Sequence, residues 1–431
     1  MKKIYKIPLF VLPAMLLASC NFKYTYKISG FEGGGEAMIE DDDMEDSGKY
    51  DIKIWVDDKI VQLTQTQVQQ FVTASGGKYE INLKVEPVGE ASAANSMLQD
   101  VQEGADLFCF AQDQLSRLKV AGALAKLNRQ TVEKLSEEMD VGAINAAKVN
   151  DDVYAFPITA DNGYFLYYDK SVVSDEDAKD MTKLLAACKA KGKTLNFEAK
   201  SNGFYAASYF MAVGCESTWD IDSDSGKFTG YKDNYAEKGL PAAKGLKELD
   251  DKTLVAGNSQ ASKLGDSSAA VVSGIWEYQV AEERMAKKGS ELGCAELPSF
   301  TVDGISYHLS SFDGYKLLGV KPQADAKKAS VCRKLARFLT GEDCQYQRFD
   351  NAKWGPTNKA AAQKEDVLAH KGLQALNAQH KYAKPQGQCP GAWFTALATT
   401  AKAVTKSSSD SQLQDILNNY KAGLDALLDE D

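Results

Sequence analysis

The stretch DIKIWVDDK at residues 51–59 is where the fold prediction begins. Isoleucine or valine recurs at every second position of its first six residues, which is the period of a strand with one buried face. Residues 60–74 contain neither glycine nor proline and are predicted to form a helix that ends at Gly76-Gly77. Because YEINLKVEPV at residues 79–88 alternates again, the sequence predicts a strand–helix–strand unit.

Strand and helix patterns continue to alternate along the chain. The further elements that we expect are helix 91–103, strand 105–111, strand 163–168, helix 177–191, strand 269–273 and helix 276–288. Helical patterns dominate from Asp325 onward, and no internal repeat follows residue 50. This alternation predicts parallel α/β sheets, and 431 residues are enough for two or three domains.

The N-terminus has the pattern of an export signal. Three lysines precede an almost wholly apolar run at residues 7–18, which is shorter than the ~20 residues that a membrane span needs. The order Leu17-Ala18-Ser19-Cys20 resembles the bacterial lipobox. We therefore expect residues 1–19 to be a lipoprotein signal peptide, cut before Cys20, which then carries the lipid. The alternative is an ordinary secretory signal followed by a chance cysteine.

Residues 20–49 are predicted to be an acidic, flexible tether. They include three consecutive glycines at 33–35 and the acidic block EDDDMED at 40–46, a composition that cannot bury enough apolar surface to fold. A calcium site is the functional alternative, but the block lacks the alternating ligands and the turn glycine of a calcium loop. The tether would let the rest of the chain reach a partner at the membrane.

Charge and cysteine usage narrow the class of protein. The formal net charge of −10 argues against nucleic acid or an anionic lipid surface as the main partner. Lipidation of Cys20 would leave seven of the eight cysteines, an odd number, with no C-x-x-C pair and only three histidines in the chain. We therefore expect no metal site and no cofactor. A disulfide between Cys332 and Cys344 would need a chain reversal near Gly341.

No motif of a common enzyme class is present. The sequence has no Gly-x-Ser-x-Gly, no phosphate-binding glycine loop and no His-Glu-x-x-His. Three scattered histidines also leave few bases for nucleophilic catalysis. We therefore expect a binding protein and not an enzyme, although a pair of carboxylates that hydrolyses glycosides stays open.

Aromatic and polar residues come together where strands are predicted to end. Such pairings occur at Trp55 with residues 57–59, at Phe110 with residues 112–114, at Asp161-Asn162, and at Trp276-Glu277. In open α/β sheets, ligands bind at the carboxyl ends of strands. An aromatic ring stacks on the C–H face of a sugar, and carboxylates and amides bind its hydroxyls. The competing interpretation places each of these rings in the core.

Six segments, read together, resemble the extracellular solute-binding proteins of ABC importers, and specifically the maltose/maltodextrin-binding-like group. These segments are KIWVDDK (53–59), ADLFCFAQDQLSRLKVAGALAKL (105–127), VYAFPITADNGYFLYYDKSVV (153–173), AAVVSGIWEYQ (269–279), KWGPTNKAA (353–361) and GAWFTALATTAKAV (391–404). The resemblance covers about residues 51–425. It departs from maltodextrin binders at Phe110, where they have tryptophan, at Gln114, where they have arginine, and at Asp161, where they have glutamate. The identity of the sugar is therefore not carried over.

The resemblance implies two α/β lobes with the ligand between them and segments that cross a hinge. Lobe 1 would comprise residues 50–159 and 302–350, and lobe 2 residues 160–301 and 351–431. The ligand-binding residues that it implies are Asp58, Lys59, Phe110, Asp113, Gln114, Asp161, Phe204, Tyr205, Trp276, Glu277, Trp354 and Trp393.

The function that follows from this resemblance is capture of an extracellular carbohydrate by hinge closure and its delivery to ABC permease subunits. The protein would be an extracytoplasmic monomer that the lipid on Cys20 holds at the cell membrane. Two other functions stay open. The same fold could bind a polyamine through its acidic and aromatic residues, although Lys59 argues against this. A surface-tethered glycosidase would need two carboxyl groups that face each other.

Overall fold

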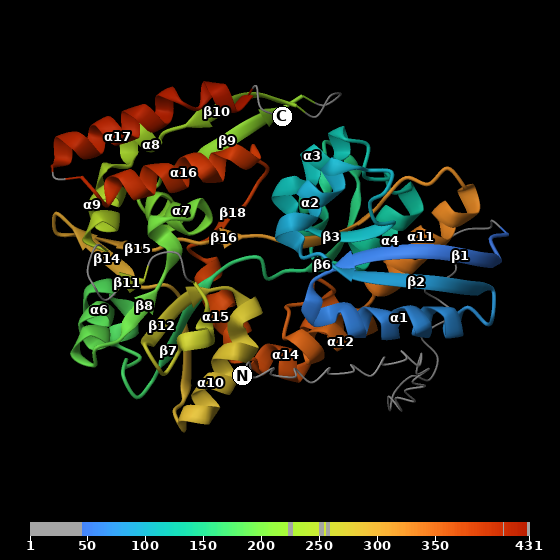
Figure 1. Ribbon diagram of the computed structural model, residues 1–431, viewed down its shortest axis with the longest axis horizontal. Coiled ribbons are helices and arrows are strands. Elements are labelled where there is room, and N and C mark those ends of the chain that lie inside the picture. The colour runs from blue at the N-terminus through green and yellow to red at the C-terminus, as the bar shows by residue number, and fades with distance from the viewer. Residues whose placement is uncertain (1–44, 223–226, 250–253, 256–258, 408, 429–431) are drawn as a thin grey trace, which may run out of the picture. The chain divides into compact units, whose positions relative to one another are not determined.

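The computed structural model describes residues 45–222, 227–249, 254–255, 259–407 and 409–428. All of them belong to one compact unit, and they contain two five-stranded sheets (Figure 1). The predicted signal peptide, Cys20, which is predicted to carry the lipid, and most of the predicted tether lie outside the described residues. Among the described helices, none has the length and apolar composition that a bilayer span requires.

The first sheet contains the stretch with which the prediction began. Its strand order is β2-β1-β3-β17-β6, with β1 parallel to β2 and β3, and with β17 antiparallel to β3 and β6. The strands are β1 (Gly48–Val56), β2 (Tyr79–Pro87), β3 (Leu107–Ala111), β6 (Ala155–Thr159) and β17 (Lys316–Val320). A short hairpin of β4 (Lys148–Val149) and β5 (Asp152–Val153) precedes β6.

Helices pack around this sheet. The helix α1 contacts β2 and α11, α2 contacts β3, and α11 contacts β17. Two glycines with positive φ, Gly76 and Gly77, follow α1, where a side chain would be strained. The helices are α1 (Val61–Ala74), α2 (Glu90–Gln99), α3 (Leu115–Val120), α4 (Arg129–Glu138), α5 (Val141–Ala146), α11 (Ala326–Leu339) and α12 (Glu342–Ala352), with the 3-10 turns η1 (Asp58–Ile60) and η2 (Gln112–Gln114).

The second sheet has the strand order β11-β8-β12-β7-β13. Its strands are β7 (Phe165–Asp169), β8 (Thr194–Asn196), β11 (Leu254–Val255), β12 (Ser268–Ser273) and β13 (Leu292–Ala295). The helices of this part are α6 (Met181–Ala190), α7 (Gly203–Ala212), α8 (Tyr235–Lys238), α9 (Leu240–Glu248), α10 (Tyr278–Lys288), α15 (Lys371–His380), α16 (Gly391–Val404) and α17 (Asp410–Ala422). The 3-10 turns are η3 (Asp177–Lys179), η4 (Glu198–Lys200), η5 (Ala261–Lys263), η6 (Ile275–Glu277) and η7 (Asp425–Leu428).

The chain passes between the two sheets several times. It leaves β6 for β7, returns through β16 (Phe312–Asp313) to β17, and leaves again after α12 through α13 (Lys359–Ala362) and α14 (Glu365–Ala369) to α15, which packs on β7 and β13. After α15, β18 (Lys384–Pro385) pairs in parallel with β16 before α16 begins. The strand β18 therefore pairs with the crossing strand β16.

Two hairpins complete the second part, namely β9 (Ser217–Ile221) with β10 (Phe228–Asp233) and β14 (Ser299–Val302) with β15 (Ile305–His308). The strand β14 contacts α9. The predicted lobe boundaries stay a prediction. Because β14 packs on α9 of the second part, we propose that the chain returns to the first part after His308 and not at residue 302.

One expectation from the sequence was wrong. Parallel sheets were expected, but both sheets are mixed, because β7 and β17 enter them from crossing segments and not through a helical crossover. The disulfide between Cys332 and Cys344, which the sequence left open, is not formed, and none of the seven described cysteines forms a disulfide. Gly341 separates α11 from α12, and the thiols of Cys332 and Cys344 are both buried.

The described end of the acidic segment is part of the fold. Asp46 is only 3% exposed and accepts hydrogen bonds from Tyr79 Oη (3.0 Å), Ser330 Oγ (2.7 Å) and Lys334 Nζ (2.7 Å). Burial opposes ionisation of Asp46, but these hydrogen bonds outweigh it and lower the pKa of its carboxyl. The residue therefore fastens the start of β1 to α11.

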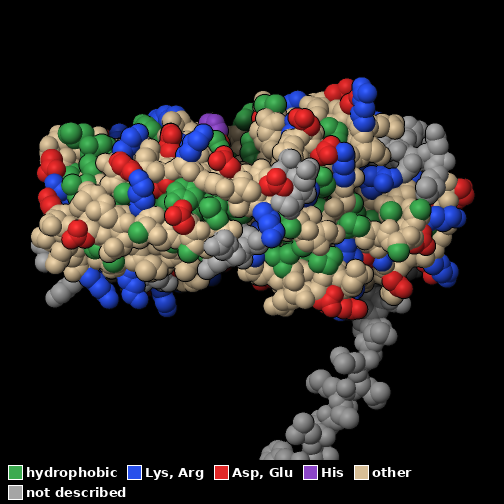
Figure 2. All heavy atoms as spheres, turned by 90° about the horizontal axis from the view of Figure 1, so that it is seen from above, with side chains coloured by type: hydrophobic (Ala, Val, Ile, Leu, Met, Phe, Trp, Pro, Cys, Tyr) green, Lys and Arg blue, Asp and Glu red, His purple; other side chains and the backbone are tan. Residues whose placement is uncertain are grey.

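Acidic and basic side chains are interspersed over the molecular face in Figure 2, with no broad patch of one sign among its described residues. Beneath the surface, one apolar cluster includes side chains from both sheets, such as Leu318 of β17 and Val271 of β12. Side chains from the two sheets therefore pack into one continuous apolar core.

Candidate functional site

A buried lysine that the sequence analysis missed lies at the centre of the candidate site. Lys316 is the first residue of β17 and is 4% exposed. Its Nζ lies 4.1 Å from the ring centroid of Trp354 and 5.6 Å from that of Trp276. The same Nζ lies 3.8 Å from Asp161 Oδ1. Three residues predicted to bind the ligand, from three separate segments, therefore meet around one ammonium group.

Asp161 is held rigidly in this cluster. It is fully buried and follows β6 by two residues. Its Oδ1 accepts a hydrogen bond from Thr159 Oγ1 (2.7 Å), and its Oδ2 accepts one from the backbone N–H of Gly355 (2.7 Å). The carboxylate thus joins the first crossing segment to the loop that carries Trp354.

Two further carboxyl groups interact with Lys316. Glu90 begins α2 and is 8% exposed, and burial raises the pKa of its carboxyl. Burial also raises the pKa of Asp57, whose carboxylate accepts from the backbone N–H of Lys59. Burial alone would lower the pKa of Lys316, but the charges of Glu90, Asp161 and Asp57 outweigh it and the pKa is raised. The ammonium therefore stays charged.

A contact between the turns that follow β1 and β12 places Lys59 beside Trp276. Lys59 Nζ donates a hydrogen bond to the backbone oxygen of Trp276 (2.5 Å). The indole lies against Gly274, where any Cβ would overlap the ring. Glu277 Oε2 accepts from the backbone N–H of Ala261 (2.7 Å), which anchors the turn. Asp58 is exposed in the same turn as Lys59.

Asp113 and Gln114, in η2, form a second cluster with Gln386 of the segment that follows β18. Gln386 Nε2 donates to Asp113 Oδ1 (2.9 Å), and Gln114 Nε2 donates to Asp113 Oδ2. Arg117 Nη1 donates to Gln114 Oε1 (2.8 Å). Burial raises the pKa of Asp113. Both side chains therefore already have protein partners here.

The remaining predicted aromatic residues lie mainly in cores. Phe110 is fully buried in β3 beside Phe108, and Tyr205 is 6% exposed in α7. Trp393 is 4% exposed and its Nε1 donates to Tyr420 Oη (2.8 Å). Phe204 is half-buried and stacks on Phe312 with ring centroids 5.2 Å apart. Their contact with a ligand stays a prediction.

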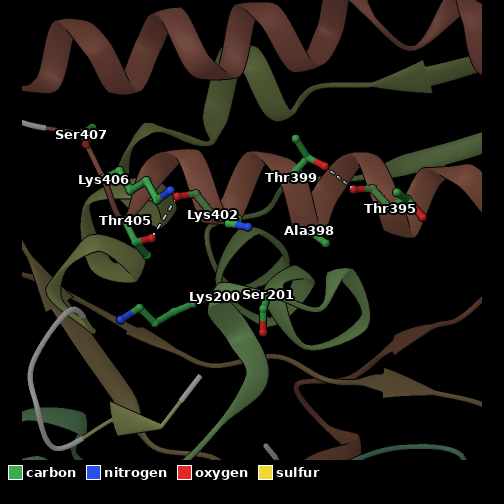
Figure 3. Close-up of a pocket in the computed structure, with 9 residues that line it drawn as sticks. All are labelled: Lys200, Ser201, Thr395, Ala398, Thr399, Lys402, Thr405, Lys406 and Ser407. Atoms are coloured by element: carbon green, nitrogen blue, oxygen red, sulfur yellow. Dashed lines mark hydrogen bonds between the residues drawn. The ribbon is translucent and has the colours of Figure 1, made fainter. Parts of the chain in front are cut away.

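The described residues include no group of three or more His, Cys, Asp or Glu side chains arranged to hold a metal ion. Two surface cavities lie along α16. One, of about 750 Å³, is lined by Lys200, Ser201, Thr395, Ala398, Thr399, Lys402, Thr405, Lys406 and Ser407 (Figure 3). The other, of about 620 Å³, lies between α16 and α17. Neither cavity is lined by a residue of the cluster around Lys316.

Comparison with solved structures reveals the same fold. A structure solved with acarbose is 25% identical, with a TM-score of 0.75, and the match covers 88% of this chain and 100% of that one. The maltodextrin-binding protein MalE1 from L. casei BL23, solved without ligand, is 19% identical, with a TM-score of 0.70 over 89% of this chain and 98% of that one. The maltotriose-binding protein of Thermus thermophilus, bound with maltotriose, is 17% identical, with a TM-score of 0.68 over 86% and 100%.

Comparison with curated proteins finds no significant match. The family model described as bacterial extracellular solute-binding protein matches residues 66–375, which is more than half of the chain. This match, and not the lack of a catalytic motif, places the chain among binding proteins. The two-sheet α/β fold expected from the sequence is confirmed. The chain belongs to the bacterial extracellular solute-binding family.

Proposed function

We propose that this protein is the carbohydrate-binding component of an ABC importer, which captures an oligosaccharide outside the cytoplasm and delivers it to a membrane permease. Family membership supports the importer role. Among the structural relatives, one was solved with acarbose and another is a maltotriose-binding protein, which supports a saccharide as the ligand. The observation that carries the proposal is the convergence of Trp276 and Trp354 on Asp161 around Lys316.

The chemistry of this cluster suits a sugar. An indole face packs on the C–H face of a pyranose ring, and carboxylate and ammonium groups bind hydroxyls through charge-assisted hydrogen bonds. A buried cation between two aromatic rings argues against the polyamine alternative, because an ammonium group of a polyamine would meet Lys316 at the same rings.

The proposed mechanism is closure of two lobes around the ligand. Two hydrogen bonds link elements that pack on different sheets. Lys59 Nζ donates to Trp276 O, and Gln279 Nε2 donates to Asn351 O (2.6 Å). A ligand that contacts both sides favours the closed form by its greater affinity for that form. The closed complex would then dock on the permease.

For attachment we propose cleavage before Cys20 and lipidation of that cysteine, with the following acidic residues as a tether. The family supports an extracytoplasmic location. In cells supplied with radiolabelled fatty acid, we expect the wild-type protein to incorporate the label and C20A to incorporate none. Equal labelling of C20A would contradict lipidation at this residue.

Calorimetry of the purified protein with a panel of maltotriose, maltotetraose, cellotriose, xylotriose and acarbose tests the carbohydrate function, with spermidine and an amino acid mixture for comparison. We expect one or more saccharides to bind with a dissociation constant in the micromolar range or tighter and to be recovered intact. Binding of spermidine or amino acids alone would contradict the proposal. Release of shorter sugars from a bound oligosaccharide would favour the glycosidase alternative.

A further inference from the structure

Lys316 has donors that no described protein group accepts. Its side chain is buried, yet Nζ forms no hydrogen bond within the described part of the chain, and its ion pair with Asp161 spans 3.8 Å. Asp161 does not satisfy these donors, because 3.8 Å is beyond hydrogen-bond distance, and its two oxygens are held by Thr159 and Gly355 at 2.7 Å. A buried ammonium normally has hydrogen-bond acceptors, since leaving its donors unpaired costs free energy.

Two neighbours of Lys316 also have unpaired polar atoms. Glu90 is 8% exposed and its Oε1 has no hydrogen-bond partner among the described residues. Trp354 is 1% exposed and the same is true of its Nε1. Of all the charges that act on Lys316, that of Glu90 acts most strongly. An unpaired acceptor on Glu90 and an unpaired donor on Trp354 thus belong to two residues that interact with the Lys316 ammonium, Glu90 through its charge and Trp354 through its ring.

The aromatic surfaces here are already used by a cation. The Lys316 ammonium lies over the rings of both Trp354 and Trp276, where it gains cation–π attraction. A second cation at these rings would be repelled by the first. A neutral hydroxyl group has no such conflict, because it can accept from an ammonium and donate to a carboxylate at the same time.

We propose that Lys316 and Glu90 form a donor–acceptor subsite that binds a hydroxyl group of a neutral saccharide, and that Lys316 makes the site reject cationic ligands. This inference rests on the proposed carbohydrate function and adds to it the residue that sets specificity. It also predicts that removing the ammonium exposes two indole faces to a cation from solution.

The test compares K316M with K334M by calorimetry, using the saccharide of the panel above that binds the wild-type protein most tightly and spermidine as the cationic probe. Methionine keeps much of the length of lysine and removes the charge. Lys334 is a matched control, because it is also a buried lysine paired with an aspartate. It lies on α11 and pairs with Asp46, which precedes β1. We expect K316M to bind the saccharide about 10- to 100-fold more weakly, the effect of losing a charge-assisted hydrogen bond, and to bind spermidine at least about tenfold more tightly. K334M should lower the melting temperature and leave both affinities unchanged.

E90Q gives a second readout if K316M folds poorly. It keeps Lys316 in place and removes the charge of the acceptor, so saccharide binding should weaken about tenfold. Wild-type saccharide affinity in K316M and E90Q, or in E90Q alone if K316M does not fold, would overturn the inference while leaving the carbohydrate function intact. If the wild-type protein binds no saccharide of the panel, the carbohydrate function fails, and this inference fails with it.

Discussion

Replacement of Trp276 by alanine is the change that separates a ligand platform from a structural residue most clearly. The indole is half-buried in η6, lies against Gly274 and faces the ammonium of Lys316 at 5.6 Å. Stacking on a sugar ring is worth about 0.5–1.5 kcal/mol beyond the buried area. Its cation–π contact with Lys316 lies within the protein and is present with and without ligand, so losing it costs about 0.5–1 kcal/mol of stability and does not enter the affinity.

Stacking alone therefore predicts that W276A raises the dissociation constant for the best saccharide of the panel about 2- to 13-fold. Isothermal titration calorimetry measures this directly. The matched control is W219A. Trp219 is a tryptophan in the β9–β10 hairpin that packs on Phe228 and Tyr231 and has no contact with Lys316. W219A should cost stability and leave the affinity unchanged. Equal affinity of W276A and the wild-type protein would refute the assignment of Trp276 to the site.

Three further predictions concern closure, stability and thiols. K59M removes the bond to the backbone oxygen of Trp276, so saccharide affinity should fall about threefold to tenfold, as expected for one exposed charge-assisted hydrogen bond. An unchanged affinity together with unchanged small-angle scattering would contradict a role in closure. D46N leaves Lys334 buried without its counter-charge, so the free energy of unfolding near pH 7 should fall by about 3 kcal/mol in urea titrations. Because the pKa of Asp46 is lowered in the folded state, ionised Asp46 stabilises the fold at a pH above its unfolded-state pKa of about 3.9. This stabilisation is lost as the pH falls through the pKa of Asp46 in the folded state. The difference between wild type and D46N should therefore shrink below about pH 4, and a constant difference from pH 7 to pH 3 would contradict this linkage. Finally, none of the seven described cysteines forms a disulfide, so all seven should react with a thiol reagent after denaturation without reductant, and fewer than seven would indicate a disulfide.

The sequence predicted the local elements of the fold well and its long-range arrangement less well. The apolar period of residues 51–56 corresponds to β1 (Gly48–Val56), and the glycine-free, proline-free run after it corresponds to α1 (Val61–Ala74). Local pattern decides these elements because it decides which face is buried. Strand direction within a sheet depends on the route of the chain between strands. No local pattern in the sequence therefore indicated that β7 and β17 run antiparallel to their neighbours.

The candidate site shows the same division. Asp161 and Trp276 were found because polar and aromatic residues at strand ends mark ligand sites in this kind of fold. Lys316 was missed because a lysine at the start of a strand is ordinarily a solvated residue. Only packing across the crossing segments buries it between Trp354 and Asp161. A signal was present in the lone charge that begins the otherwise apolar strand KLLGV at residues 316–320.

The partner of Asp113 was equally inaccessible from the sequence. The carboxylate and Gln386, which donates to it, lie 273 positions apart. A strand end rich in aspartate and glutamine looks the same whether its side chains bind a ligand or another segment of the chain. Only the position of the segment after β18 shows that Asp113 binds Gln386 of the same chain.

A crystal structure of the protein with a bound saccharide from the panel is the most direct test of the proposed carbohydrate site. We expect a sugar ring within stacking distance of Trp276 or Trp354, with a hydroxyl group hydrogen-bonded to Lys316 Nζ. A saccharide bound elsewhere, for example in the cavities along α16, with Lys316 Nζ still between the two indoles and without contact to the sugar, would contradict it.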